Sequence, residues 1–363
     1  MARTKNSNLH AAARAKKDEF YTQIEDIENE LGHDEYWEFF RGKTILCNCD
    51  DPYESEFFKY FAMNFNALGL KKLIVTNYSG SPISGAELVL PGFEEFYAKP
   101  RNEIACKIII PELRDWNGDG REDLEDIRHY ILNHGGCWER LKGDGNFLAG
   151  DFRSAECIEF LREADVVVTN PPFSLFREYV AQLMKFNKKF AIIGPFNAIT
   201  YKEIFPLIKN NQIWLGYGFN KGNAYLSLPR GNYKDFADGV YNPETGLVKF
   251  RNMTWFTNIP LKKYKEELVL DFEYSPELYP HYDNYDAIEV SKTARIPKDY
   301  FGVMGVPITF LDKYNPEQFE IIWTSDRGGD GEIEWLKKPH DRYDAPVIGG
   351  KGVYKRIFIR RRV

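Results

Sequence analysis

Residues 164–173 read ADVVVTNPPF, and the fold of the chain is predicted outward from this stretch. Its β-branched run predicts a short buried strand. The strand ends at Asn170, whose side chain carries both a carbonyl acceptor and amide donors. Pro171 and Pro172 then stiffen the backbone and lack N–H groups, and Phe173 adds an aromatic face. This rigid corner suits a planar substrate with an exocyclic amine, although Asn-Pro-Pro alone is also compatible with a plain turn.

The segments on both sides of this stretch alternate between strand and helix patterns. Strands are predicted at residues 43–49, 72–77, 190–193, 213–216 and 253–256, and helices at residues 18–31, 57–68, 155–163 and 175–186. Residues 146–151 continue the same alternation. Strands that alternate with helices predict an α/β fold with a doubly wound, mostly parallel sheet. Ligands of such sheets bind at the carboxyl ends of strands, where four polar side chains are expected: Asp50, Asp51, Asp151 and Asn170.

Length and composition set the limits for this fold. A chain of 363 residues can hold one large domain and a smaller one, and a hydrophobic content of 43% allows a sizeable core. No apolar run approaches the ~20 residues of a membrane span, and the polar N-terminus lacks the apolar core of a secretory signal. Five cysteines, an odd number, indicate reduced thiols and a cytoplasmic protein. The net charge of −6 does not mark a nucleic-acid binder, but an enzyme needs only a local basic cleft.

Three parts are expected along the chain. Residues 1–17 form a basic arm, which is either a solvated terminus or a tail that contacts phosphates. Residues 18–262 carry the strand–helix alternation, with a long insertion at about residues 79–145. Residues 263–363 change to shorter runs rich in Tyr, Pro and Asp, and this indicates a second domain. Its last segment, residues 351–362, alternates in a way that predicts a strand with cations on one side.

The insertion contains a candidate calcium loop. Residues 115–126 read DWNGDGREDLED and match the EF-hand loop at positions 1, 3, 5, 6 and 9, with Asp in place of the final bidentate Glu. The ligands would be Asp115, Asn117, Asp119, Asp123 and Asp126, with Arg121 contributing its backbone carbonyl. Calcium bound here would be structural. The alternative is an Asp/Asn/Gly turn that caps the helix predicted at residues 124–133, and the sequence leaves both readings open.

The chain resembles the DNA adenine-N6 methyltransferases, and specifically the group of the EcoRI modification methylase. Residues 170–173 match the catalytic tetrapeptide of that family. Residues 20–22 look like the motif on the methionine side of the cofactor, and residues 150–152 like the strand-end acid that binds the cofactor's adenine. The resemblance reaches the C-terminal part through residues 302–307 and 326–328. The order of these motifs resembles the gamma arrangement of amino-methyltransferases.

This resemblance implies a Rossmann-like class I methyltransferase fold with a smaller C-terminal α+β region, S-adenosylmethionine as the cofactor and double-stranded DNA as the partner. The implied catalytic residues are Asn170, Pro171, Pro172 and Phe173. The implied cofactor contacts are Phe20, Tyr21, Thr22, Asp50, Asp51, Pro52, Asn77, Asp151, Phe152 and Asn170. One departure is clear, because Ser55 and Phe57 stand where the family's first loop has glycines. For Asp50 and Asp51, the capping of a helix is the alternative role.

The implied reaction is a direct methyl transfer to adenine N6. The Asn170 side-chain oxygen and the Pro171 carbonyl would each accept one N6 hydrogen, while Phe173 stacks on a base flipped out of the duplex. Cations near the C-terminus are candidate phosphate contacts, with a solvated tail as the alternative: Lys351, Lys355, Arg356, Arg360, Arg361 and Arg362.

Other functions fit the residues less well. Cytosine-C5 methylation needs a nucleophilic cysteine, typically after a proline, and none of the five cysteines follows one. Cytosine-N4 enzymes usually have Ser in place of Asn170. Protein-glutamine methyltransferases share Asn-Pro-Pro, but Phe173 and the basic C-terminal region argue against that substrate. A DNA-binding protein without catalysis would not need the intact tetrapeptide. The sequence leaves the target motif and the oligomeric state open, and a monomer is compatible with it.

Overall fold

The computed structural model describes residues 21–49, 55–78, 105–133, 138–219, 223–227, 240–325 and 345–362. The chain divides into two compact units. The first comprises Met1–Pro195 and Tyr217–Ile259, and the second comprises Phe196–Gly216 and Pro260–Val363. The second unit therefore includes a segment, residues 196–216, that the sequence analysis placed in the catalytic domain.

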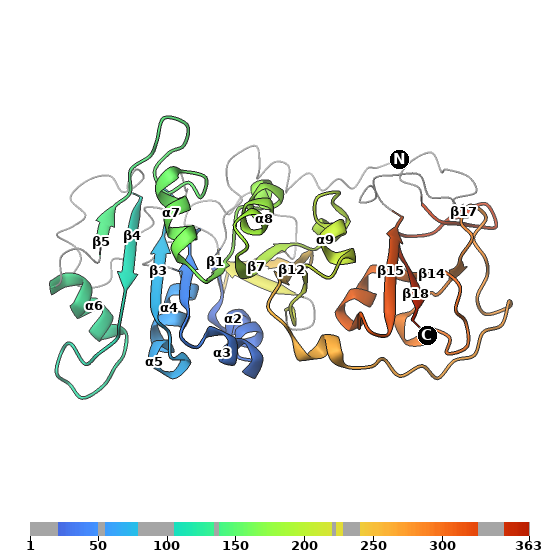
Figure 1. Cartoon of the computed structure of the whole chain (residues 1–363), viewed down its shortest axis with the longest axis horizontal. Coiled ribbons are helices and arrows are strands. Elements are labelled where there is room, and N and C mark those ends of the chain that lie inside the picture. The colour runs from blue at the N-terminus through green and yellow to red at the C-terminus, as the bar shows by residue number, and fades with distance from the viewer. Residues whose placement is uncertain are drawn as a thin grey trace. The chain divides into compact units, whose positions relative to one another are not determined.

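A large central sheet forms the first unit (Figure 1). The strands that this unit contributes run in the order β5 (Trp138–Arg140), β4 (Cys106–Ile110), β3 (Lys72–Thr76), β2 (Thr44–Cys47), β6 (Val166–Thr169), β7 (Lys189–Pro195) and β12 (Met253–Thr257). The four central strands, β3, β2, β6 and β7, are parallel, whereas β4, β5 and β12 pair antiparallel. The fold is thus mixed α/β with a mostly parallel central sheet, as predicted. The insertion supplies β4 and β5 and so extends one edge of this sheet.

The central strands consist of apolar, often β-branched residues because helices cover both faces of a parallel sheet. All residues of β2 and β6 are buried. Val167 in the middle of β6 lies opposite Leu46 of β2 on one side and Phe190 of β7 on the other. This packing gives the strand ends a fixed position.

The helices in the described parts of the first unit are α2 (Ile24–Leu31), α3 (Asp34–Phe40), α4 (Glu56–Met63), α5 (Phe65–Leu68), α6 (Leu124–Asn133), α7 (Ala155–Glu163) and α8 (Phe176–Lys185). Serines cap two of them: Ser55 accepts the N–H groups of Phe57 and Phe58, and Ser154 accepts that of Cys157. The helix predicted at residues 57–68 is in fact two helices, α4 and α5, that meet at Asn64. Among the described residues, no helix is long and apolar enough to cross a membrane.

The order of the parallel strands reverses direction between β2 and β6. The chain passes from β2 outward to β3 on one side, and from β6 outward to β7 on the other. Right-handed crossovers in opposite directions put α4 and α8 on opposite faces of the sheet. Sheets of this kind bind ligands outside the carboxyl ends of the strands at such a reversal. Residues after β2 and β6 are therefore the first candidates for a site.

A smaller four-stranded sheet also belongs to the first unit. Its order is β1 (Tyr21–Thr22), β9 (Ala224–Ser227), β11 (Leu247–Phe250) and β10 (Tyr241–Asn242). The strands β1 and β9 are antiparallel, with Thr22 opposite Leu226. This pairing fixes the position of β1 although nearly the whole first unit separates the two strands in sequence.

The second unit contains a four-stranded sheet in the order β13 (Ile288–Glu289), β14 (Met304–Pro307), β18 (Arg356–Arg361) and β15 (Phe319–Thr324). The single strand predicted at residues 351–362 is wrong, because β17 (Lys351–Gly352) and β18 are separate and β17 pairs with β16 (Val347–Ile348). Ile357, Phe358 and Ile359 are all fully buried. Because consecutive residues of a strand face opposite sides, both faces of β18 are covered.

Candidate active site

Asn170 lies directly after β6, at the reversal point of the central sheet. It is half-buried, and its Nδ2 donates to Oγ1 of Thr22 at 3.4 Å. Thr22 belongs to β1 and is buried. The structure therefore brings together two residues that the sequence analysis assigned to catalysis and to cofactor binding, although 148 positions separate them.

The rest of the tetrapeptide forms a rigid connection to α8. Pro171 is buried, whereas Pro172 and Phe173 are half-buried. Pro172 precedes a short 3₁₀ helix, η3 (Phe173–Leu175), that runs directly into α8. The first residue of α8, Phe176, is fully buried against Gly194 of β7. A Cβ at Gly194 would lie 2.3 Å from the Phe176 ring, so glycine is needed there for α8 to approach the sheet.

Asp151 lies in a loop before α7, so the expectation that it ends a strand is wrong. The loop nevertheless reaches the carboxyl end of β3. Gly150 has φ +78°, and a Cβ there would be 1.8 Å from the carbonyl oxygen of Asn77. Glycine at residue 150 thus permits the close approach that places Asp151 beside β3.

Asn77, which follows β3, uses its side chain to hold the neighbouring strand. Its Oδ1 accepts the backbone N–H of Cys106 at 2.6 Å, and its own backbone N–H donates to the Cys106 carbonyl at 3.2 Å. The side-chain oxygen of Asn77, which the resemblance placed among the cofactor contacts, therefore has a structural partner.

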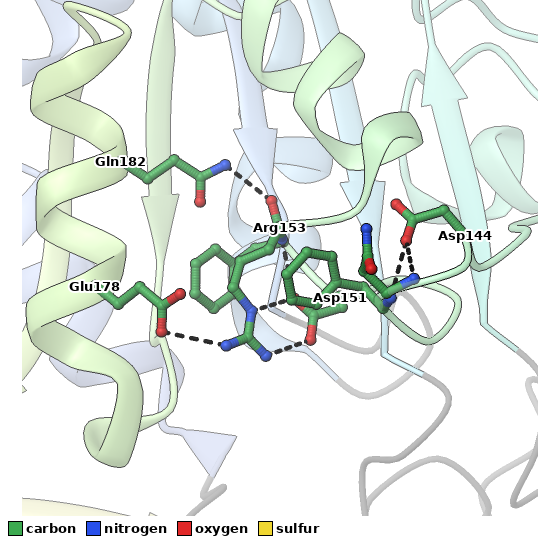
Figure 2. Close-up of polar contacts among 8 residues, drawn as sticks. Asp144, Asp151, Arg153, Glu178 and Gln182 are labelled. Carbon is green, nitrogen blue, oxygen red and sulfur yellow. Dashed lines mark hydrogen bonds and ion pairs between the residues drawn. The ribbon is translucent and has the colours of Figure 1, made fainter.

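Asp151 forms a two-pronged ion pair with Arg153 (Figure 2). Oδ1 accepts Nε of Arg153 at 2.9 Å and also its backbone N–H at 2.9 Å, while Oδ2 accepts Nη2 at 2.7 Å. The third arm of the guanidinium, Nη1, lies 3.2 Å from Oε2 of Glu178 on α8. The hydrogen bonds to Asp151 raise the pKa of Arg153, whereas its partial burial opposes them. The cation therefore bridges the loop and the helix.

One face of α8 holds the segment around Asp151. Gln182, one turn after Glu178, donates from Nε2 to the Phe152 carbonyl at 2.9 Å (Figure 2). Tyr179 packs edge-on against the Phe152 ring, with centroids 4.9 Å apart, and its hydroxyl donates to Oδ1 of Asn48 after β2. The helix that continues from the tetrapeptide thus also positions Phe152 and the end of β2.

The sequence analysis missed Arg153, Glu178 and Gln182. Two signals could have revealed them. Arg153 follows directly after Asp151 and Phe152, and Glu178 and Gln182 are four positions apart and so share one face of a predicted helix. Neither signal identifies the partner, because the loop and the helix meet only in the tertiary structure.

The calcium prediction is not supported by the structure. Asp126 is fully buried, and its two oxygens accept the backbone N–H groups of Trp116, Asn117 and Asp123. Asp115 accepts three further backbone N–H groups from residues 118–120. Among the described residues, no group of three or more His, Cys, Asp or Glu is arranged to hold a metal ion. The loop is a turn that caps α6, which was the alternative.

The predicted DNA-contacting cations differ in their surroundings. Arg356 is a structural cation, because it forms a buried ion pair with Glu289 at 2.6 Å. Arg361 donates to the Lys298 carbonyl and Arg362 to the Pro316 carbonyl. Lys351 and Arg360 are exposed, and Lys355 is half-buried. The six phosphate contacts stay a prediction, and it applies best to the exposed members because Arg356 already has a structural partner.

Several predicted residues lie outside the described parts of the chain. They are the arm at residues 1–17, Phe20, Asp50, Asp51, Pro52, residues 79–104 at the start of the insertion, and residues 326–328. Tyr21 is described only by its backbone, which pairs with Ser227 in the smaller sheet.

Known proteins resemble this chain over nearly its full length. The model of a family described as "Adenine-specific methyltransferase EcoRI" matches residues 8–362. The type II methyltransferase M.EcoRI of Escherichia coli is 42% identical, covering 98% of this chain and 97% of the relative. M.MpnI of Mycoplasma pneumoniae is 36% identical, covering 86% and 84%. M.MgeORF184P of Mycoplasma genitalium is also 36% identical, covering 87% and 85%. No solved structure matches the chain significantly.

These matches, together with the mostly parallel central sheet, define an adenine-specific DNA methyltransferase that uses S-adenosylmethionine. The chain belongs to the EcoRI family of these enzymes. The resemblance noted from the sequence is thereby confirmed for the family and for the reaction.

Proposed function

We propose that the corner formed by residues 170–173 receives the target adenine, and that the segment around Asp151 receives the adenine of the cofactor, in a Rossmann-like class I arrangement. The observation that carries this proposal is the hydrogen bond between Asn170 and Thr22, which joins the predicted catalytic and cofactor segments. The reversal point between β2 and β6 lies at the same end of the sheet.

The residues present fit the cofactor. Asp151 offers a buried carboxylate acceptor, as an adenine amine requires, and Phe152 offers an adjoining ring. Thr22 offers a hydroxyl beside Asn170. When bound, S-adenosylmethionine supplies a methyl group activated by a positively charged sulfur. The chain itself must hold and orient the amine that accepts this group.

Asn170 and Pro171 perform that orientation in the proposed mechanism. The adenine N6 is a weak nucleophile because its lone pair is delocalised into the ring. Oδ1 of Asn170 and the carbonyl of Pro171 each accept one N6 hydrogen. This favours a tetrahedral nitrogen, whose lone pair is no longer delocalised into the ring and can point at the methyl group. Thr22 accepts from Nδ2 of Asn170 and thereby fixes which atom of the amide faces the substrate. Placed dipoles of this kind lower a barrier without a covalent intermediate.

The target base must leave the duplex to reach such a corner, because N6 lies inside the base stack. We propose double-stranded DNA as the substrate and the second unit as the region that recognises it. The exposed Lys351 and Arg360 support this role through phosphate contacts. Replacing both with Ala should weaken DNA binding and make it less dependent on salt, by a slope of about 0.9 for each phosphate that the variant no longer neutralises. An unchanged salt dependence would contradict this assignment.

Turnover of Asn170 variants tests the mechanism. Asn170→Ala should lower methylation by at least ~10²-fold, as does the loss of other transition-state hydrogen bonds, while cofactor affinity changes little. Thr22→Val should reduce turnover by roughly tenfold, because Asn170 loses the partner that orients it. Asn133→Ala, an exposed substitution at the end of α6, is the matched control. Wild-type turnover of Asn170→Ala would refute the proposed mechanism.

A further inference from the structure

Arg153 controls how many hydrogen bonds Asp151 can accept from a ligand. A carboxylate has about four acceptor positions, two on each oxygen. On Oδ1, the backbone N–H and Nε of Arg153 occupy both, each at 2.9 Å. On Oδ2, Nη2 of Arg153 occupies one at 2.7 Å. Among the described residues, Asp151 therefore keeps one acceptor position, and it lies on Oδ2.

The Arg153 guanidinium, which leaves Asp151 one acceptor position, is itself held by contacts on several sides. Its Nη1 pairs with Glu178 at 3.2 Å, and its central carbon lies 4.7 Å from the Phe147 ring centroid and 5.2 Å from that of Phe152. Asp144 fixes Phe147 in turn, because its Oδ1 accepts the Phe147 N–H at 2.9 Å. A planar fork held in this way keeps the carboxylate in one orientation, which a flexible lysine could not do.

We propose that Arg153 is a positioning residue that makes Asp151 a single-acceptor site for the exocyclic amine of the cofactor's adenine. The inference rests on the proposed role of Asp151 in cofactor binding. An amine at C6 of a purine donates to the remaining position on Oδ2. A carbonyl at C6 is itself an acceptor and would leave this remaining position on Oδ2 without a donor. Sites built around one such hydrogen bond discriminate strongly against ligands that lack it.

The consequence is a preference that can be measured without turnover. S-adenosylhomocysteine and S-inosylhomocysteine differ in the Watson–Crick edge of the purine: the amine at C6 becomes a carbonyl, and N1 gains a hydrogen. Calorimetry on the full chain gives both dissociation constants. The wild-type protein should prefer the adenosine compound by roughly 10- to 100-fold, the range for a hydrogen bond to a charged group. If Arg153 only stabilised the fold, its loss would weaken the binding of both compounds equally. If Arg153 orients Asp151, its loss should lower the ratio of the two dissociation constants, inosine compound over adenosine compound.

Three variants carry the test. Arg153→Met should lower the ratio to roughly one-tenth of the wild-type value or less, and Arg153→Lys should give an intermediate ratio, because it keeps the charge but not the fork. Arg162→Met is the matched control, because exposed Arg162 also pairs with a glutamate and lies over a phenylalanine ring. Its ratio should equal that of the wild type. If Arg153→Met does not fold, Arg153→Lys decides the matter alone.

The outcomes separate this inference from the function on which it rests. A wild-type ratio in the folded Arg153 variants, or a wild-type protein that binds both compounds equally, overturns the role of Arg153 and leaves the methyltransferase proposal intact. A wild-type protein that binds neither compound contradicts the proposed cofactor site itself, and the inference then fails with it.

Discussion

Two acidic loops in the first unit are similar in composition, but their carboxylates have different hydrogen-bond partners. Residues 115–126 and residues 144–153 are both rich in Asp, Asn and Gly, and each leads into a helix, α6 or α7. In the first loop, Asp126 accepts three backbone N–H groups of its own loop. In the second, Asp144 accepts two backbone N–H groups of its own loop and that of Ala155 in α7, but Asp151 pairs with a side chain and lies beside a strand end. The hydrogen-bond partners of a carboxylate therefore indicate its role better than the spacing of acidic residues in the sequence does.

The largest expected effect of this difference is on cofactor affinity. Asp151→Asn should weaken the binding of S-adenosylhomocysteine by roughly 10- to 100-fold, because the amide cannot keep both hydrogen bonds of the guanidinium and still accept the adenine amine in the same way. Calorimetric titration measures this change. If the affinity of Asp151→Asn stayed within twofold of the wild type, the two loops would not differ in their importance for cofactor binding.

Asp126→Ala should lower the stability of the protein and leave its cofactor affinity unchanged. The loss of three backbone hydrogen bonds at the start of α6 should lower the free energy of unfolding by about 2 kcal/mol. Cofactor affinity at a temperature where the variant is folded should stay at the wild-type value. Urea unfolding and the same titration give both quantities. Weakened cofactor binding by the folded variant would mean that the first loop also supports the site.

Asp144 provides an intermediate case within the second loop. Asp144→Ala releases the N–H groups of Asn146, Phe147 and Ala155, and so loosens the ring that lies against Arg153. Cofactor affinity should fall by roughly twofold to tenfold, the effect of one neutral hydrogen bond. A reduction as large as that of Asp151→Asn would show that the loop conformation, and not the ion pair, determines binding.

The pH dependence of stability sharpens the structural role of Asp126. Burial alone would raise the pKa of this carboxyl, but the N–H groups of Asp123, Asn117 and Trp116 together bring it below its ordinary value of 3.8. A depressed pKa in the folded state adds stability above the unfolded pKa, and that stability is lost as the pH falls through the folded value. The stability difference between wild type and Asp126→Asn should therefore shrink below about pH 4. A constant difference across that range would contradict the assignment.

Calcium should have the smallest effect. Because backbone N–H groups occupy the carboxylates of residues 115–126, the unfolding temperature should be the same with calcium and with a chelator. A calcium-dependent rise that is absent in Asp115→Asn would restore the calcium reading of this loop.

The sequence allowed the central strands and the family to be predicted because those signals are local. The apolar run that ends at Asn170 and the tetrapeptide after it need no tertiary information. The resemblance assigned Thr22 and Asn170 to one site, but the hydrogen bond between them was not predicted, since 148 positions separate them. Arg153 was missed because its importance depends on Glu178, which reaches it only after α8 has packed on the sheet.

The same reasoning explains the errors. A spacing of oxygen ligands cannot reveal whether backbone N–H groups or a metal will occupy them, so the calcium loop and the capping turn share one sequence pattern. Likewise, a cation in an alternating segment can face solvent or a buried glutamate, as Arg356 faces Glu289. Both distinctions depend on contacts between distant segments.

The central claim is that the corner at Asn170 methylates adenine N6 in DNA. It is tested most directly by mass spectrometry of nucleosides from unmethylated duplex DNA incubated with S-adenosylmethionine and either the wild type or Asn170→Ala. The account predicts N6-methyldeoxyadenosine in the wild-type digest and at least ~10²-fold less with the variant. A methyl group found on cytosine, or equal N6-methylation by both proteins, would contradict it.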